Sequence, residues 1–125
     1  MPIAHTPADV DRLFAEAMSA GDLDGALAMY EEDACFDNGS GNPAYGHEQI
    51  RHVLADLIAQ SSNLNCYEID VVENGDLAVL RARWIYSGTD AGGQAFESRG
   101  RSIEIVRRQP DGSWKFTIDL PSGAS

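Results

Sequence analysis

The side chains best suited to acid–base chemistry lie in two parts of the sequence. Asp37 and Asn38 lie just before the Gly/Pro-rich residues 39–43. Glu104 lies in a segment of the C-terminal half with the alternating pattern of side chains that is typical of a strand. A carboxyl group can give or take a proton when its pKa is near the working pH, and burial is one cause that moves it there. Asp37 and Glu104 are therefore the candidate catalytic residues, and Asn38 could orient a carbonyl group.

The sequence has no pattern typical of a metal, disulfide, phosphate-binding or nucleophilic site. His47 and His52 are five residues apart, whereas a helical zinc pair is spaced i, i+4. Cys35 and Cys66 lack metal-ligand spacing and are too few for a disulfide framework, so we expect two small buried thiols. The sequence shows no glycine-rich phosphate loop and no nucleophile triad. We therefore expect no metal and no cofactor.

Three helices are expected to open the chain. Thr6 and Pro7 supply an N-cap and a proline at the first helical position. Apolar residues then recur at helical spacing. This pattern predicts helices over residues 7–19, 23–33 and 46–60, with a short strand at 34–37 before the third.

The second half changes to strand alternation. It predicts strands over residues 64–73, 77–89, 94–109 and 113–120, joined by short turns that favour an antiparallel meander. Helices followed by a meander indicate an α+β fold in which the helices cover one face of a curved sheet. We expect one domain over residues 1–125.

Alternation assigns side chains to the two faces of this sheet. The inner face is predicted to hold Leu80, Ala82, Trp84, Tyr86, Ser98, Gly100, Ser102, Glu104, Val106, Phe116, Ile118 and Leu120. Glu104 would then lie between Leu80 and Ile118, where desolvation raises a carboxyl pKa. The alternative is that Glu104 pairs with Arg108 or reaches the open end of the cone.

The outer face is predicted to be basic. It carries Arg81, Arg83, Arg99, Arg101, Arg107 and Lys115, together with Ile85, Ile103, Ile105 and Asp119. Such a face could be solvated, could form a dimer through Arg–Asp pairs and the isoleucines, or could bind an anion. A bulge at Gly100 would exchange the faces beyond it and turn Arg101 and Asp119 inward.

The charge distribution narrows the possible partners. The formal net charge is −11, which argues against nucleic acid, because that binding depends on Lys and Arg. Residues 1–76 contain fifteen acids and two bases, and residues 77–125 contain five acids and seven bases. No apolar run approaches the ~20 residues that span a bilayer, and the N-terminus lacks signal-peptide features. We expect a cytoplasmic protein that does not bind a membrane.

The segment from Ala17 to Tyr30, AMSAGDLDGALAMY, resembles the start of the ketosteroid isomerases and their polyketide-cyclase-like (SnoaL-like) relatives in the nuclear transport factor 2-like superfamily. The resemblance continues through residues 32–34, 46–51 and 112–116 and so covers nearly the whole chain. It implies a cystatin-like cone, in which a curved antiparallel sheet wraps around three N-terminal helices. The same cone hosts isomerases, cyclases, dehydratases and association domains, so it specifies no reaction.

The resemblance also indicates which residues of this chain occupy the catalytic positions of the isomerases. Those enzymes use a carboxylate base, with a Tyr and a protonated Asp that donate hydrogen bonds to the oxyanion. Here the base position corresponds to Asn38, the Tyr position to Phe14 and the Asp position to the neighbourhood of Glu104. Phe14 lacks a hydroxyl and Asn38 cannot accept a proton, so steroid isomerisation by that mechanism is not expected.

Two functions fit these observations. The first is a cofactor-independent isomerase, lyase or cyclase that binds a small apolar molecule, with a binding site formed by Phe14, Tyr30, Asn38, Ala82, Trp84, Ser102 and Ile118. The second is a non-enzymatic dimerisation or ligand-sensing domain, in which Trp84 and its neighbours plug the cone. A homodimer through the outer face of the sheet is expected in either case.

Overall fold

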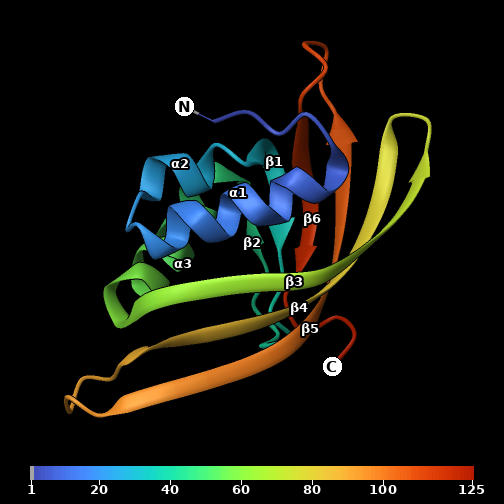
Figure 1. Cartoon of the computed structure of the whole chain (residues 1–125). Coiled ribbons are helices and arrows are strands. Elements are labelled where there is room, and N and C mark those ends of the chain that lie inside the picture. The colour runs from blue at the N-terminus through green and yellow to red at the C-terminus, as the bar shows by residue number, and fades with distance from the viewer. Residues whose placement is uncertain (1) are drawn as a thin grey trace.

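The computed structural model describes residues 2–125, apart from the side chains of Ser61 and Ser62. In chain order its elements are α1 (Pro7–Ser19), α2 (Leu23–Leu27), β1 (Tyr30–Phe36), β2 (Ala44–Tyr45), α3 (Gly46–Gln60), β3 (Ser61–Asn74), β4 (Leu77–Thr89), β5 (Ala95–Arg108) and β6 (Trp114–Leu120). Figure 1 shows the helices gathered on one side of a strongly curved sheet, with α1 lying across its concave face. The predicted α+β cone is confirmed.

Local sequence signals set the helix starts. The Thr6 hydroxyl accepts a hydrogen bond from Asp9 N, and the Asp22 carboxylate accepts one from Gly25 N at 2.9 Å, so each begins a helix as an N-cap. The predicted second helix is too long, because α2 ends at Leu27 and β1 begins at Tyr30. From Tyr30 onward the backbone pairs with β6 instead of with itself.

The sheet has the order β2-β1-β6-β5-β4-β3. Strands β3 to β6 form the predicted antiparallel meander. The sequence did not predict the partner of β1, which runs parallel to β6 and carries β2 on its outer edge. This pairing brings Tyr30 against Phe116, with the two ring centroids 4.8 Å apart in the core.

A bulge in β6 decides which side chains face inward. Val106 pairs with Phe116, but the next residue, Ile105, pairs with Ile118, so Thr117 is extra on its strand. Beyond the bulge Asp119 lies opposite Glu104 on the inner face. The predicted inward positions of Ile118 and Leu120 are therefore wrong, since these residues pair with the outward Ile105 and Ile103.

The alternative bulge at Gly100 does not form. The β4–β5 register runs without a shift from Leu77–Arg107 to Thr89–Ala95, and Gly100 lies opposite Trp84. Arg101 consequently remains on the outer face, directly opposite Arg83.

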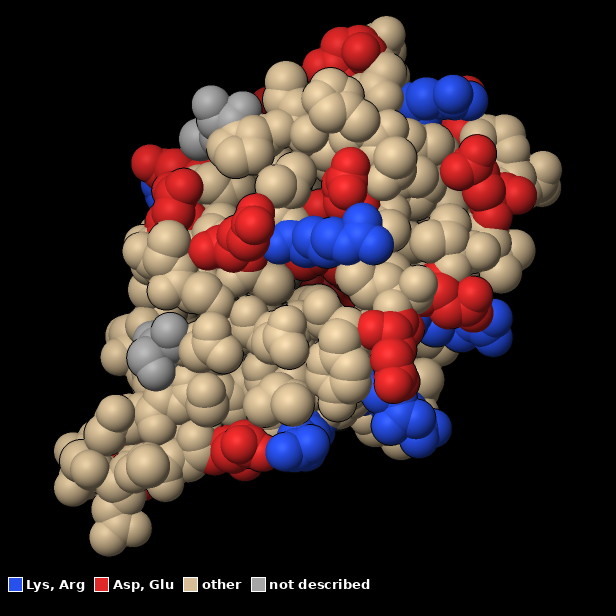
Figure 2. All heavy atoms as spheres, viewed as in Figure 1, with Lys and Arg blue, Asp and Glu red and all other residues tan. Residues whose placement is uncertain are grey.

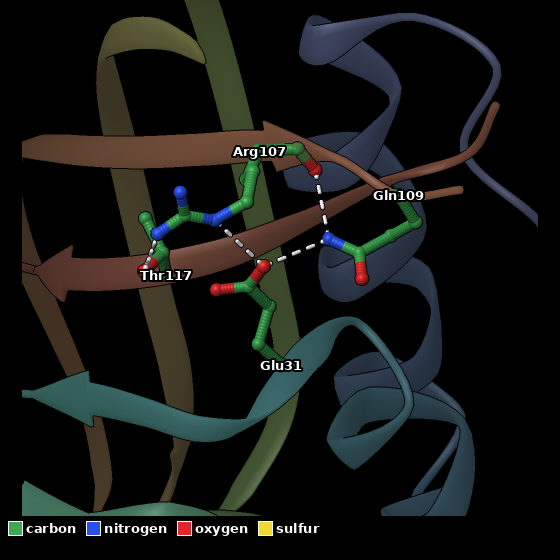
Figure 3. Close-up of polar contacts among 4 residues, drawn as sticks. All are labelled: Glu31, Arg107, Gln109 and Thr117. Carbon is green, nitrogen blue, oxygen red and sulfur yellow. Dashed lines mark hydrogen bonds and ion pairs between the residues drawn. The ribbon is translucent and has the colours of Figure 1, made fainter. Parts of the chain in front are cut away.

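A polar network on the outer side joins β1, β5 and β6 at the bulge (Figure 3). Glu31 Oε2 accepts hydrogen bonds from Arg107 Nε at 3.0 Å and from Gln109 Nε2 at 2.9 Å. Arg107 Nη2 also reaches Thr117 Oγ1 at 3.4 Å. Thr117, the extra residue of β6, is thus linked to β5 by Arg107, which also binds Glu31 of β1, and this favours the register that turns Asp119 inward.

Candidate functional site

A cavity of about 320 Å³ lies between the helices and the concave face of the sheet. This volume is at the lower end of the ~300–1,000 Å³ that is usual for small-molecule sites. Its apolar lining consists of Phe14, Met18, Phe36, Val53, Leu57, Leu64, Trp84, Tyr86, Phe96, Phe116 and Pro121. Its polar lining consists of Asp11, Asn38, Cys66, Ser98, Ser102, Glu104, Asp119 and Ser122.

Three buried carboxyl groups contribute to this lining. Asp11 comes from α1, and Glu104 and Asp119 are cross-strand neighbours on β5 and β6. The exposed fractions of Asp11, Glu104 and Asp119 are 3%, 3% and 5%. Carboxylates so deeply desolvated shift toward the neutral form.

The three groups differ in how far their pKa values rise. Burial raises the pKa of Glu104 to about 11, with the neighbouring acids Asp11 and Asp119 adding to the effect. Burial raises the pKa of Asp119 to about 7, against a hydrogen bond from Tyr30 that lowers it. Burial also raises the pKa of Asp11, to about 6, while its hydrogen bond with Glu104 and the Arg12 charge oppose the rise.

Tyr30 fixes the position of the Asp119 carboxyl group. Its hydroxyl donates to Asp119 Oδ2 at 2.5 Å, and both side chains are buried. The Tyr30 ring packs edge-on against Phe14, with the centroids 5.7 Å apart. Tyr30 therefore does not line the cavity itself but holds a residue that does.

Asp11 and Glu104 form a second polar unit. Their side chains are hydrogen-bonded to one another, and Ser102 adds a hydrogen bond to Glu104. Asp11 Oδ2 and Glu104 Oε1 have no other hydrogen-bond partner among the described residues. Because a proton held by Glu104 can serve both oxygens, the pair is most stable with one proton and one negative charge.

Trp84 forms part of the cavity wall and does not plug the cone. A Cβ atom at Gly100 would lie 2.3 Å from Trp84 Cζ2, so the indole covers a strand position that only glycine leaves open. The indole Nε1 donates to the Pro121 carbonyl at 2.6 Å, which attaches the segment after β6 to β4. The ring is thus held flat against the sheet and leaves the cavity open.

The structure brings five of the predicted site residues into the cavity lining: Phe14, Asn38, Trp84, Ser102 and Glu104. Asp37 is next to Asn38, but its carboxylate accepts a hydrogen bond from Gly39 N at 2.8 Å within its own loop. Ala82 is buried outside the lining, and Ile118 faces away because of the bulge. Arg108, the alternative partner expected for Glu104, pairs with Asp76 instead, at 2.8 Å.

The sequence reasoning missed Asp11 as a site residue and placed Asp119 on the wrong face. Asp11 could have been found, because it precedes Phe14 by three residues and Met18 by seven and so lies on the apolar stripe of α1. Asp119 had no local signal. Its inward position depends on the one-residue shift at Thr117.

The described part of the chain contains no group of three or more His, Cys, Asp or Glu side chains arranged to hold a metal ion. Over the same residues, no helix combines the length and the apolar character required to cross a bilayer.

Residues 10–116 match the family of SnoaL-like domains, and the chain belongs to this family. The match includes most of the cavity lining. No curated protein matches the chain by sequence.

Solved structures share the fold closely. A candidate aromatic ring hydroxylase from Novosphingobium aromaticivorans DSM is 30% identical, with a TM-score of 0.80 over 94% of this chain and 86% of the other. A ketosteroid isomerase-like protein from Erwinia carotovora atroseptica SCRI1043 is 18% identical, with a TM-score of 0.80 over 94% and 93%. A candidate scytalone dehydratase from Novosphingobium aromaticivorans DSM 12444 is 14% identical, with a TM-score of 0.80 over 90% and 78%. The last two likenesses concern the fold alone.

Proposed function

We propose that this protein binds a small, largely apolar molecule in the cavity and moves a proton on it by general acid–base catalysis. The observation that carries the proposal is the placement of Asp11, Glu104 and Asp119, all buried, in an otherwise apolar cavity. Such a cavity selects a ligand by its apolar surface and offers it few polar groups. An isomerase, lyase or cyclase reaction fits, since each requires a proton to leave a carbon atom.

Asp119 is the group we propose to take and return the proton. A catalytic carboxyl group works best when its pKa lies near the operating pH, and burial raises the pKa of Asp119 to about 7. Tyr30 holds one carboxyl oxygen at 2.5 Å and leaves the other for the substrate. Glu104, whose pKa burial raises to about 11, stays protonated and acts as a hydrogen-bond donor.

Asp37 remains the alternative base. It precedes the cavity residue Asn38, but one of its carboxylate oxygens is engaged by Gly39 N. The two assignments differ in a measurable way, because Asp119→Asn and Asp37→Asn each remove one carboxylate with little change in shape.

The test uses a simple ketone, 4-phenyl-2-butanone, in deuterated buffer at pD 7. A base in the cavity removes an α-proton to give the enolate, and a deuteron from solvent replaces it, so the α-proton NMR signal decays. We expect the wild type to accelerate this decay and Asp119→Asn to lose about 10²–10⁴-fold of the acceleration. Asp37→Asn serves as the matched control and should retain it. No acceleration by the wild type would refute proton transfer, and a loss confined to Asp37→Asn would move the base to that residue.

Ligand sensing without catalysis is the second candidate. It shares the open cavity beside Trp84 but needs no proton transfer. Binding of the ketone without exchange, detected by chemical-shift changes in the Trp84 indole, would favour this function.

We further propose a homodimer through the outer face of the sheet. Val72, Val79, Ile105 and Ile118 are successive cross-strand neighbours and form one apolar row across β3, β4, β5 and β6. Val72 and Val79 are 55% and 36% exposed. Sedimentation equilibrium at micromolar concentration should give a dimer that Ile105→Glu dissociates, whereas a wild-type monomer would contradict the proposal.

A further inference from the structure

The Asp11–Glu104 pair lacks a cationic partner inside the cavity. The residues that line this cavity in the described part of the chain include no Lys, Arg or His. Arg12 is adjacent to Asp11 in sequence, but its side chain is 58% exposed and pairs with Asp9 at 3.2 Å. Apart from the proton that the two acids can share, Asp11 Oδ2 and Glu104 Oε1 have no hydrogen-bond partner among the described residues. One negative charge then remains buried without a cationic donor, so the pair favours a ligand that brings N–H donors.

The charge of the pair defines which donors fit. Burial raises the pKa of Glu104 to about 11, which keeps that group neutral at pH 7. The pKa of Asp11, raised by burial to about 6, leaves it mostly ionised at the same pH. The pair then carries one negative charge in an apolar surrounding, and one positive charge on a ligand would neutralise it.

The cavity wall is also suited to a cation. Phe14, Phe36, Trp84, Phe96 and Phe116 are among its lining residues, and the face of an aromatic ring attracts positive charge. The net charge of −11 adds a long-range field that draws cations to the protein. Figure 2 shows the same excess on one surface, where each basic side chain lies beside acidic ones.

We infer that the cavity binds a hydrophobic amine, whose ammonium group lies between Asp11 and Glu104 while its apolar body packs against the aromatic wall. This inference rests on the proposed function, because it assumes that a small molecule enters the cavity beside Asp119. An ammonium group has three N–H donors, so it can donate to the ionised Asp11, to the carboxyl oxygen of Glu104 that carries no proton, and to one further acceptor. Asp119 remains free to act as the base.

The other titratable groups near the pair do not supply the missing charge. Tyr30 contributes from β1 and Cys66 from β3, and burial raises the pKa of both, so they stay neutral at physiological pH. Asp119, from β6, adds negative charge as the pH rises through about 7. From α1, Arg12 acts on Asp11 only from the exposed surface.

The experiment compares three probes of matched shape by isothermal titration calorimetry: 4-phenylbutylamine, 4-phenyl-1-butanol and 4-phenylbutanoate. At pH 8 the amine should bind about 10-fold or more tightly than the alcohol, as expected for a charge-assisted contact, and the carboxylate should bind most weakly. At pH 5 only about a tenth of the Asp11 groups are ionised, so the affinity for the amine should fall about 10-fold. The affinity for the alcohol should change little.

Asp11→Asn and Asp119→Asn form the matched pair of variants. Asp11→Asn should abolish the preference for the amine and preserve binding of the alcohol. It should fold, because the new amide can donate to Glu104 Oε1, and thermal melting checks this. Asp119→Asn removes the same charge from the same cavity and should keep the preference. If Asp11→Asn fails to fold, the pH dependence measured in Asp119→Asn decides the matter, because between pH 8 and pH 5 that variant can lose the charge of Asp11 but not that of Asp119.

The outcomes separate the inference from the proposed function. If the wild type binds the alcohol at least as tightly as the amine at pH 8, the amine inference is wrong and the ligand-binding proposal stands. A preference that is lost in Asp119→Asn but kept in Asp11→Asn also overturns the inference, because it moves the cation to the other acid. If no probe binds, both the inference and the ligand-binding proposal fail.

Discussion

Acidic side chains on the two faces of the sheet have different kinds of partner. On the outer side, Glu31 accepts from Arg107 and Gln109, and Arg81 pairs with Asp70. On the inner side, Asp119 has a tyrosine hydroxyl as its partner and Asp11 has another acid. The outer acids therefore have arginine or amide donors as partners, whereas burial shifts the inner acids toward the neutral form. The inner arrangement places proton exchange near neutral pH, so chemistry is expected there, whereas the ion pairs of the outer face are expected to support the structure.

The largest effect that tests this contrast is the pH dependence of stability. The folded-state pKa values of Asp11, Glu104 and Asp119 are raised to about 6, 11 and 7, so between pH 4 and 7 the folded protein binds more protons than the unfolded chain. Each such group lowers the free energy of unfolding as the pH rises, by roughly 1.4 kcal/mol per pH unit between its unfolded and folded pKa values. Denaturant unfolding should show greater stability at pH 5 than at pH 8, by several kcal/mol.

Glu104→Gln sharpens that measurement. The amide removes one of the three titrating groups, so the loss of stability between pH 5 and pH 8 should become smaller. Equal slopes in the wild type and the variant would mean that the inner acids do not titrate as their burial implies. A wild type that is more stable at pH 8 would contradict the contrast between the two faces.

The next effect concerns the hydrogen bond that holds Asp119. Tyr30→Phe removes the donor at 2.5 Å and should raise the pKa of Asp119 above about 7, because that bond lowers it. The destabilisation should be about 1.5–3 kcal/mol at pH 8, where the carboxylate is charged, and smaller at pH 5. Carbon-detected NMR titration of the Asp119 carboxyl group measures the pKa. An unchanged pKa would show that Tyr30 is only a core residue.

The smallest effect belongs to the outer face. Glu31 is 13% exposed but its partner Arg107 is 50% exposed, so solvent screens the pair. Glu31→Gln should cost at most about 1 kcal/mol. A double-mutant cycle with Arg107→Gln, followed by denaturant unfolding, measures the coupling. A cost above that of Tyr30→Phe at pH 8 would reverse the order of the two faces.

Local signals account for much of the fold and part of the site. Thr6 with Pro7 and the apolar stripe of α1 specify the first helix, and strand alternation with short turns specifies the meander. Alternation also placed Glu104 opposite Leu80 on the inner face, as the structure does. These features were predictable because each depends on residues close together in the chain or across one short turn.

The rest depended on contacts between distant segments. The first part of β1, residues 30–33, was predicted as helix and only its end as strand, because its partner β6 lies more than eighty residues later in the chain. The extra residue at Thr117 reverses the facing of Asp119 and Ile118, and its register is supported by Glu31 and Arg107 from other strands. The sequence by itself thus determined the class of fold and one buried acid. Tertiary structure decided that three acids share a cavity, because a one-residue shift in a strand moves every following side chain to the opposite face.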